Sequence, residues 1–129
     1  MATTTLARPD MQARSQSKLL AGSELAAEMA ALIGRKLTAY IAGVKDVRSV
    51  DRWIAGGQFY GDAEERLRFG YQVVRMLSDF DRPSTVQAWL MGINPELGDR
   101  APIKLMREYP IAEIAPQVLG AARAFVAGG

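Results

Sequence analysis

The stretch from Ser84 to Pro102, with the sequence STVQAWLMGINPELGDRAP, carries more helix-start and helix-stop signals than a plain linker requires. Ser84 followed three residues later by Gln87 is a capping box, in which each side chain satisfies an otherwise unpaired amide at the start of a helix. Gly92 can adopt the left-handed conformation that ends a helix. The first half of the stretch therefore predicts a short helix capped at Ser84 and closed at Gly92.

The second half of this stretch predicts an ordered loop and the start of another helix. Asn94-Pro95 is typical of a fixed turn. Pro102 suits the first position of a helix, because its missing N–H would be unpaired there in any case. We expect the whole stretch to set the angle between the helices on either side, and so to aim the C-terminal end of the chain.

The composition excludes several classes of protein. The chain has 129 residues, of which 49% are hydrophobic, so it can bury the core of one domain or of two very small subdomains. It contains no Cys and no His, and therefore no thiolate nucleophile, no Cys-based zinc site and no histidine base. The acidic residues are scattered, without a candidate catalytic pair. We expect no enzyme activity, no metal and no cofactor.

The net charge and the hydropathy pattern indicate in which compartment the protein acts and which classes of partner it can bind. A formal net charge of +2 gives no global attraction to nucleic acid. The chain has no apolar run of about 18 residues, which a membrane-spanning helix needs. Its first residues are polar and lack the apolar core of a signal peptide. These patterns predict a cytoplasmic binding module with no membrane partner.

The helix signals predict an all-α fold in three parts. Residues 1–20 show no helix or strand period and are expected to form a flexible arm. Residues 21–60 should form a small helical unit, and residues 61–129 should form a long connecting helix and a C-terminal helical subdomain. A helix beginning near Ser23 should end at Gly34. Its apolar stripe has helical spacing and consists of Leu25, Met29, Leu32 and Ile33.

The segment Lys36–Gly57 has the pattern of a helix-turn-helix. A short first helix should end near Gly43, which can take the left-handed conformation. Asp46 is a good N-cap for a second helix, from Val47 to about Ala55. Three residues of this second helix should face the core, namely Val50, Trp53 and Ile54.

The outward face of that second helix is the candidate nucleic-acid interface. A recognition helix buries one face and presents basic and polar side chains to phosphates and base edges. We expect Arg48 and Arg52 to contact DNA, with an affinity that falls steeply as salt rises. Asp46 and Asp51 oppose phosphate binding, and an ordinary solvated face is the alternative. The candidate nucleic-acid-binding residues are Lys45, Arg48, Ser49 and Arg52.

Residues 62–80 should form the longest helix. Asp62 and Glu65 make an acidic version of the capping box. Gly70 costs about 1 kcal/mol relative to Ala in mid-helix, which suggests the close approach of another backbone. The helix is apolar on two sides, so it either joins the N- and C-terminal helices into one core or supplies a dimer contact. The first stripe is Leu67, Tyr71, Val74 and Leu77, and the second is Phe69, Val73, Met76 and Phe80.

Two further helices should follow, over residues 103–109 and 111–126. Pro110 should end the first of them. Pro116 lies inside the second and should kink it or mark its true start. The last helix either docks on the core or offers an anchor to a partner protein. Its apolar stripe is Ile111, Ile114, Val118 and Phe125.

A set of residues around the central loop can be compared with a known family: Trp89, Leu90, Asn94, Pro95, Leu97, Gly98, Pro102 and Leu105. Together they resemble the C-terminal toxin-binding domain of antitoxins in the MbcA/ParS/Xre family. Residues 48–53 look like the recognition helix of Xre-type regulators, which precedes that domain in the family. The resemblance covers roughly residues 35–129.

The resemblance implies the antitoxin of a type II toxin–antitoxin system. Such an antitoxin is a small helical homodimer that blocks the active-site cleft of a RES-domain, NAD-degrading toxin and binds its own operator DNA. The alternative is a stand-alone Xre-like transcriptional repressor without a toxin partner, whose C-terminal domain only dimerises. The resemblance implies structural roles for Trp89, Asn94, Pro95 and Pro102, and steric contacts with the toxin at Arg123, Phe125, Val126, Gly128 and Gly129.

Overall fold

The computed structural model describes residues 12–13 and 20–128, and this part of the chain is helical without a strand. The expected all-α fold is therefore confirmed. The predicted N-terminal arm, residues 1–20, lies almost entirely outside the described residues. The helices are α2 (Gly22–Ile33), α3 (Arg35–Ala42), α4 (Val47–Ile54), α5 (Ala63–Ser78), α6 (Pro83–Met91), η2 (Pro95–Leu97, a 3₁₀ helix), α7 (Pro102–Glu108) and α8 (Ile111–Gly128).

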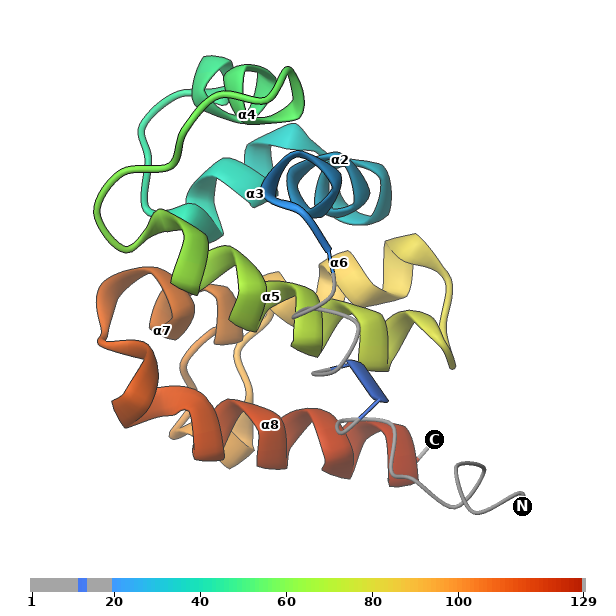
Figure 1. The fold of residues 1–129 in the computed structure, drawn as a ribbon. Coiled ribbons are helices and arrows are strands. Elements are labelled where there is room, and N and C mark those ends of the chain that lie inside the picture. The colour runs from blue at the N-terminus through green and yellow to red at the C-terminus, as the bar shows by residue number, and fades with distance from the viewer. Residues whose placement is uncertain (1–11, 14–19, 129) are drawn as a thin grey trace, which may run out of the picture.

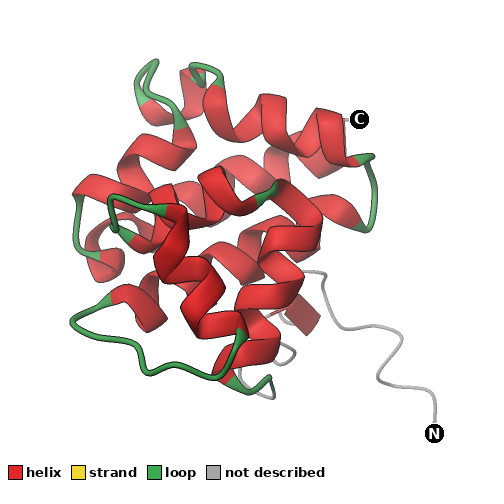
Figure 2. Ribbon diagram, turned by 90° about the horizontal axis from the view of Figure 1, so that it is seen from above, coloured by secondary structure: helices red, strands yellow, loops and turns green. Residues whose placement is uncertain are grey.

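Helix α5 crosses the middle of the molecule (Figure 1). On one side it contacts α2 and α3, and on the other it contacts α7 and α8. Helix α4 packs on α2 and α3, at the far end from α8. Figure 2 shows the same arrangement from above, with one extended loop, residues 55–62 between α4 and α5, among shorter ones. One continuous hydrophobic cluster connects residues from α2 through α8.

Both apolar sides of α5 are covered by helices of the same chain. The first stripe is buried throughout, as are Phe69, Val73 and Met76 of the second. The single chain therefore provides the common core, which was the first of the two expected roles. Phe80 is the exception, with 55% of its surface exposed. Helix α5 ends at Ser78, so Phe80 lies beyond the helix and the prediction for this residue is wrong.

Gly70 allows a close approach, but the neighbours are side chains and not another backbone as expected. A Cβ atom at Gly70 would lie 2.9 Å from Cγ2 of Ile41 and 3.2 Å from Cε of Met29. These atoms belong to α3 and α2. The glycine in mid-helix is explained by the packing of α5 against both helices.

The start of α5 differs from the expected capping box. Asp62 occupies the N-cap position but makes no side-chain cap hydrogen bond. Its carboxylate instead accepts a hydrogen bond from Nε of Arg66 at 2.8 Å. The same guanidinium donates from Nη1 to the carbonyl oxygens of Met106 and Tyr109 at 2.7 and 2.8 Å. Arg66 therefore satisfies backbone carbonyls at the C-terminal end of α7.

Helix α6 begins two residues earlier than the capping box predicted. Arg82 is the N-cap, Pro83 takes the first helical position, and Ser84 lies within the helix. Proline suits that position because its φ angle is already helical and it needs no partner for an N–H. Gly92 ends the helix with φ −83°, not in the left-handed conformation. The predicted cap at Ser84 is therefore wrong, whereas the helix does close at Gly92 as expected, but without the left-handed conformation.

Helix α8 is the longest helix among the described residues, with 18 residues against 16 in α5, which corrects the expected order. It begins at Ile111, so Pro116 lies inside it and does not mark its start. Helix α7 begins with Pro102, as expected, and ends at Glu108. Within the described ranges, no helix combines the length and apolar character needed to cross a bilayer.

Candidate functional site

The turn between α3 and α4 is built by two local signals. Gly43 has φ 82°, and its left-handed conformation closes α3. Asp46 is the N-cap of α4 and accepts a hydrogen bond from the backbone N–H of Arg48 at 2.7 Å. Both positions were expected from the sequence. The short turn places the first residues of α4 directly beside the end of α3.

The inner face of α4 is anchored by Val50 and Trp53, which are buried. The indole ring of Trp53 stacks on Phe59 at 4.6 Å between centroids. Ile54, expected to face inward, is exposed over 39% of its surface. Since Ile54 is the last residue of α4, no following helical turn covers it. That prediction is wrong, but the other two anchors fix which face of α4 points outward.

Two acidic side chains on the outer surface are each paired with an arginine. The guanidinium of Arg48 binds Asp46 at 2.8 Å, and Arg35 binds Asp51 at 2.6 Å. The hydrogen bonds from the Arg48 side chain and backbone lower the pKa of Asp46 from its ordinary value. The same side-chain hydrogen bond raises the pKa of Arg48. Arg48 remains highly exposed, with 86% of its side chain accessible.

The remaining predicted residues lie along the same outer surface. Lys45 lies in the turn and Arg52 near the end of α4, and both are exposed. Within the described part of the chain, neither side chain makes an ion pair. Ser49 is half-buried. The structure therefore brings Lys45, Arg48, Ser49 and Arg52 onto the turn and a single short helix, as a nucleic-acid interface would require.

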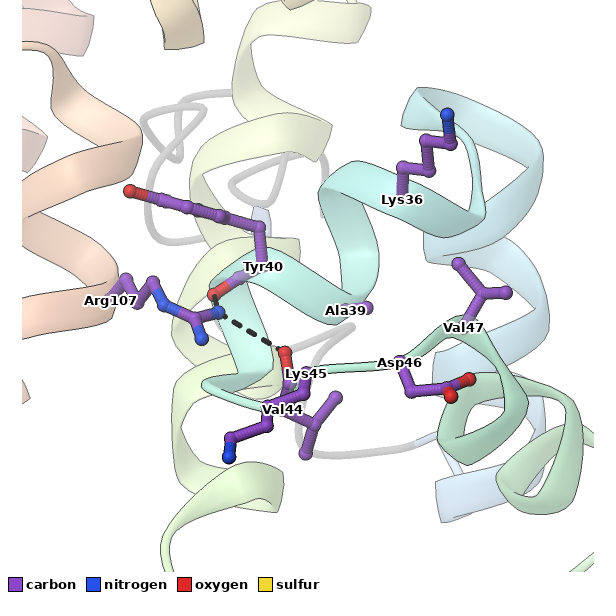
Figure 3. Close-up of a pocket in the computed structure, with 8 residues that line it drawn as sticks. All are labelled: Lys36, Ala39, Tyr40, Val44, Lys45, Asp46, Val47 and Arg107. Atoms are coloured by element: carbon purple, nitrogen blue, oxygen red, sulfur yellow. Dashed lines mark hydrogen bonds between the residues drawn. The ribbon is translucent and has the colours of Figure 1, made fainter.

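Sequence reasoning missed an arginine that reaches this turn from α7. Arg107 donates from Nη1 to the carbonyl oxygens of Tyr40 and Val44, at 2.9 and 3.2 Å (Figure 3). A surface cavity of about 520 Å³, wide open to solvent, adjoins these groups. Its lining comes from α3, the turn, the start of α4 and α7: Lys36, Ala39, Tyr40, Val44, Lys45, Asp46, Val47 and Arg107. No local sequence pattern links α7 to α3, so only the fold could show this contact.

The loop after α6 is held by backbone and side-chain hydrogen bonds. Oδ1 of Asn94 accepts from the backbone N–H of Glu96 at 2.9 Å, and Pro95 begins the 3₁₀ helix. Gly98 and Asp99 both have positive φ, of 66° and 61°. Asn94 and Pro102 are buried. These contacts give Asn94, Pro95 and Pro102 a structural place in the loop.

The C-terminal helix is docked on this loop region. Trp89 is 9% exposed, and its ring lies 6.3 Å from the ring of Phe125, centroid to centroid. Val126 is half-buried, whereas Arg123 and Gly128 are exposed. Gly129 lies outside the described residues. Of the residues expected to meet a toxin, Phe125 and Val126 are thus partly engaged by the chain itself, and Arg123 and Gly128 lie at the surface.

Within the described residues, no cluster of three or more acidic side chains is placed to hold a metal ion. A polar pair lies at the edge of the core, where the hydroxyl of Tyr71 donates to Oε1 of the exposed Glu28 at 2.7 Å. Burial, together with this hydrogen bond, raises the pKa of Tyr71 to about 12. This pair links α5 to α2 and lies outside the α3–α4 surface.

No protein-family model, no curated protein and no solved structure matches this chain. The functional argument therefore depends on the residues themselves and on the geometry described above.

Proposed function

We propose that the chain is the antitoxin of a type II toxin–antitoxin system. In this proposal it acts in the cytoplasm as a homodimer, binds its operator DNA through α4 and neutralises a RES-domain toxin that degrades NAD. The observation that carries the DNA-binding part is the orientation of α4. Val50 and Trp53 hold its inner face in the core, while Arg48 and Arg52 are exposed on its outer face.

The local charge also favours a nucleic-acid partner. Residues 35–55 contain five basic and two acidic side chains, although the whole chain has a net charge of only +2. Both acidic side chains are already paired with arginines, as described above. A phosphate that approaches Arg48 must compete with Asp46, whereas Lys45 and Arg52 have no such competitor among the described residues. Basic side chains on one short helix supply the phosphate contacts that DNA binding requires.

The DNA-binding part is tested with the double variant Arg48→Ala plus Arg52→Ala. Its affinity for the DNA upstream of the gene should fall at least about tenfold at low salt, and the slope of log affinity against log salt should decrease by about 2. The control, Arg82→Ala plus Lys104→Ala, removes the same charge from exposed positions outside α4. Equal affinities of the native chain and the α4 variant would exclude DNA binding by this face.

The toxin-binding part is supported by the resemblance of the Trp89–Leu105 segment to the antitoxin family. In this proposal the exposed end of α8, which includes Arg123 and Gly128, enters the cleft of the toxin and blocks it sterically. Co-expression with a RES-domain protein encoded beside this gene, followed by size-exclusion chromatography, tests the partnership. A single complex that contains both chains is expected, and separate elution of the two chains would contradict it.

The contact between Trp89 and Phe125 favours a second function, that of a stand-alone Xre-like repressor. Because Phe125 packs within its own chain, α8 has a role in completing the core that requires no toxin, and in the repressor it would also support a dimer. The two functions differ in one observation. A repressor of this kind binds its operator with full affinity although no toxin gene lies beside its own, whereas the antitoxin has a toxin gene there.

A further inference from the structure

The cavity between α3, the α3–α4 turn and α7 combines positive charge with an apolar wall (Figure 3). Its volume of about 520 Å³ lies within the range of about 300–1,000 Å³ that is usual for sites of small organic ligands. Three of the lining side chains are basic, namely Lys36, Lys45 and Arg107. Asp46 is the one acidic residue that lines it.

The carboxylate of Asp46 does not neutralise the positive charge of the basic residues that line the cavity. Asp46 is engaged by the guanidinium and the backbone N–H of Arg48, which is not among the lining residues. Within the described residues, Lys36 and Lys45 form no ion pair or hydrogen bond through their side chains. Lys36, Lys45 and Arg107 therefore surround a site that lacks a free counter-charge, and Figure 3 shows the ammonium groups of Lys36 and Lys45 at opposite edges of it, pointing away from one another. An anion is the ligand that such a site favours.

Arg107 is held in place before any ligand binds. Two carbonyl oxygens of the α3 terminus fix its Nη1, and its Cζ lies 4.6 Å from the centroid of the Tyr40 ring. Its Nε and Nη2 make no hydrogen bond within the described part of the chain. A guanidinium that is fixed in this way offers planar, paired donors at little entropic cost, which is the geometry that phosphate oxygens accept.

The rest of the wall is suited to the organic part of a ligand. Ala39, Val44 and Val47 contribute aliphatic groups, and Tyr40 contributes its aromatic ring. We propose that this cavity binds a phosphate group attached to an organic moiety. Two sources carry this chemistry, a phosphorylated small molecule and the backbone of DNA, and the experiment below separates them. The proposal goes beyond the DNA contacts of α4, because Lys36, Tyr40 and Arg107 lie on α3 and α7.

The test uses the full-length, ¹⁵N-labelled protein and three probes in separate titrations. The probes are sodium pyrophosphate, a 5′-mononucleotide, and a short DNA duplex of unrelated sequence. Backbone amide shifts of Tyr40, Lys45 and Val47 report on the cavity. The variant Lys36→Glu reverses one exposed charge of the cavity without breaking a described contact, and it leaves the candidate DNA contacts Lys45, Arg48 and Arg52 intact. Lys104→Glu is the control, with the same change of charge at an exposed position outside the cavity.

Saturable shifts of the cavity amides with pyrophosphate and the mononucleotide identify a small-molecule site, provided that the variants differ as follows. The affinity for both probes should fall about tenfold or more in the cavity variant and less than twofold in the control. The same pattern with the DNA duplex alone identifies a backbone contact. Absence of shifts with all three probes, or equal weakening in both variants, overturns the proposal. Arg48 and Arg52 remain intact throughout, so either of these results leaves operator binding by α4 to be judged by its own variant.

Discussion

Arg107 donates a hydrogen bond from Nη1 to the carbonyl oxygen of Tyr40 at 2.9 Å, and its guanidinium also lies over the ring of the same residue. Tyr40 lies in the last turn of α3, and its carbonyl oxygen also accepts a hydrogen bond from the backbone N–H of Gly43, the C-cap residue, at 3.1 Å. A residue of α7 therefore completes the end of α3, and it does so at the turn that leads into α4. The C-terminal half of the chain thereby holds the candidate nucleic-acid interface in place.

Arg107→Ala should destabilise the protein by about 2 kcal/mol, because two partly buried carbonyl oxygens lose a charged donor. Urea unfolding measures the change. Arg107→Lys should recover only part of the loss, since an ammonium group lacks the planar fork of the guanidinium. Lys104→Ala, on an exposed position of the same helix, should change stability by less than about 0.5 kcal/mol. Similar stabilities of the Arg107→Ala and Lys104→Ala proteins would show that the contact contributes nothing.

Gly70→Ala should destabilise the protein although alanine favours helices. The gain in helix propensity is about 1 kcal/mol, but the new Cβ would lie 2.9 Å from Cγ2 of Ile41. Overpacking of this kind costs about 1–3 kcal/mol. Gly120→Ala is the matched control, because a Cβ at Gly120 of α8 would meet no atom within 4 Å. Thermal unfolding should show a lower Tm for Gly70→Ala and a higher Tm for Gly120→Ala, and an increase in both would contradict the packing described here.

Asp46→Asn should separate the two roles of Asp46. Asparagine still caps a helix, so stability should change by less than about 1 kcal/mol. The substitution removes the carboxylate that binds Arg48, and under the proposed function DNA affinity should increase about threefold to tenfold at low salt. Asp46→Ala should give a similar gain in affinity but lose about 1 kcal/mol of stability with the cap. A fluorescence anisotropy titration with operator DNA measures the affinities, and a weaker complex with Asp46→Asn would refute the role of Arg48.

The free energy of unfolding should decrease in alkaline solution, because the hydroxyl of Tyr71 ionises at a lower pH in the unfolded chain than in the folded one. The folded state raises the pKa of this hydroxyl to about 12, mainly by burial and also through Glu28. The unfolded chain loses the same proton near pH 10. Below pH 10 both states are protonated and the group has no effect on the pH dependence. Between pH 10 and about 12 only the unfolded state ionises, so the free energy of unfolding decreases. Tyr71→Phe should remove this component, and identical pH profiles of the two proteins would exclude it.

The sequence predicted best those features that depend on neighbouring residues. Gly43 and Asp46 end one helix and begin the next by local backbone conformation, and the bounds of α3 and α4 follow from them. The buried stripe of α5 was also predictable, because helical spacing alone places its apolar residues together. The prediction from neighbouring residues was wrong at the start of α6, where two adjacent residues each favour a different first position of the helix. Pro83 takes the first position of α6, so Ser84 cannot serve as its cap.

Contacts between distant segments were beyond sequence reasoning. Arg66 and Arg107 each donate a hydrogen bond to a backbone carbonyl oxygen at the end of another helix. In both cases the donor and the acceptor are 40 or more positions apart in the chain. Nothing in the residues around them marks these partners, so the cavity beside Tyr40 was not predicted. The ring contact between Trp89 and Phe125 belongs to the same class. It gives Phe125 a packing role in addition to the toxin contact proposed for it.

The measurement that most directly tests the antitoxin proposal is growth rescue in cells that express the RES-domain protein encoded beside this gene. The full chain should restore growth, and a chain that ends at Ala121 should not, because it lacks the exposed end of α8. Circular dichroism of the shortened protein, and the variant Phe125→Leu in the full chain, separate loss of folding from loss of the toxin contact. Rescue by the folded, shortened chain would contradict the blocking model, and failure of the full chain to rescue growth would contradict the antitoxin function itself.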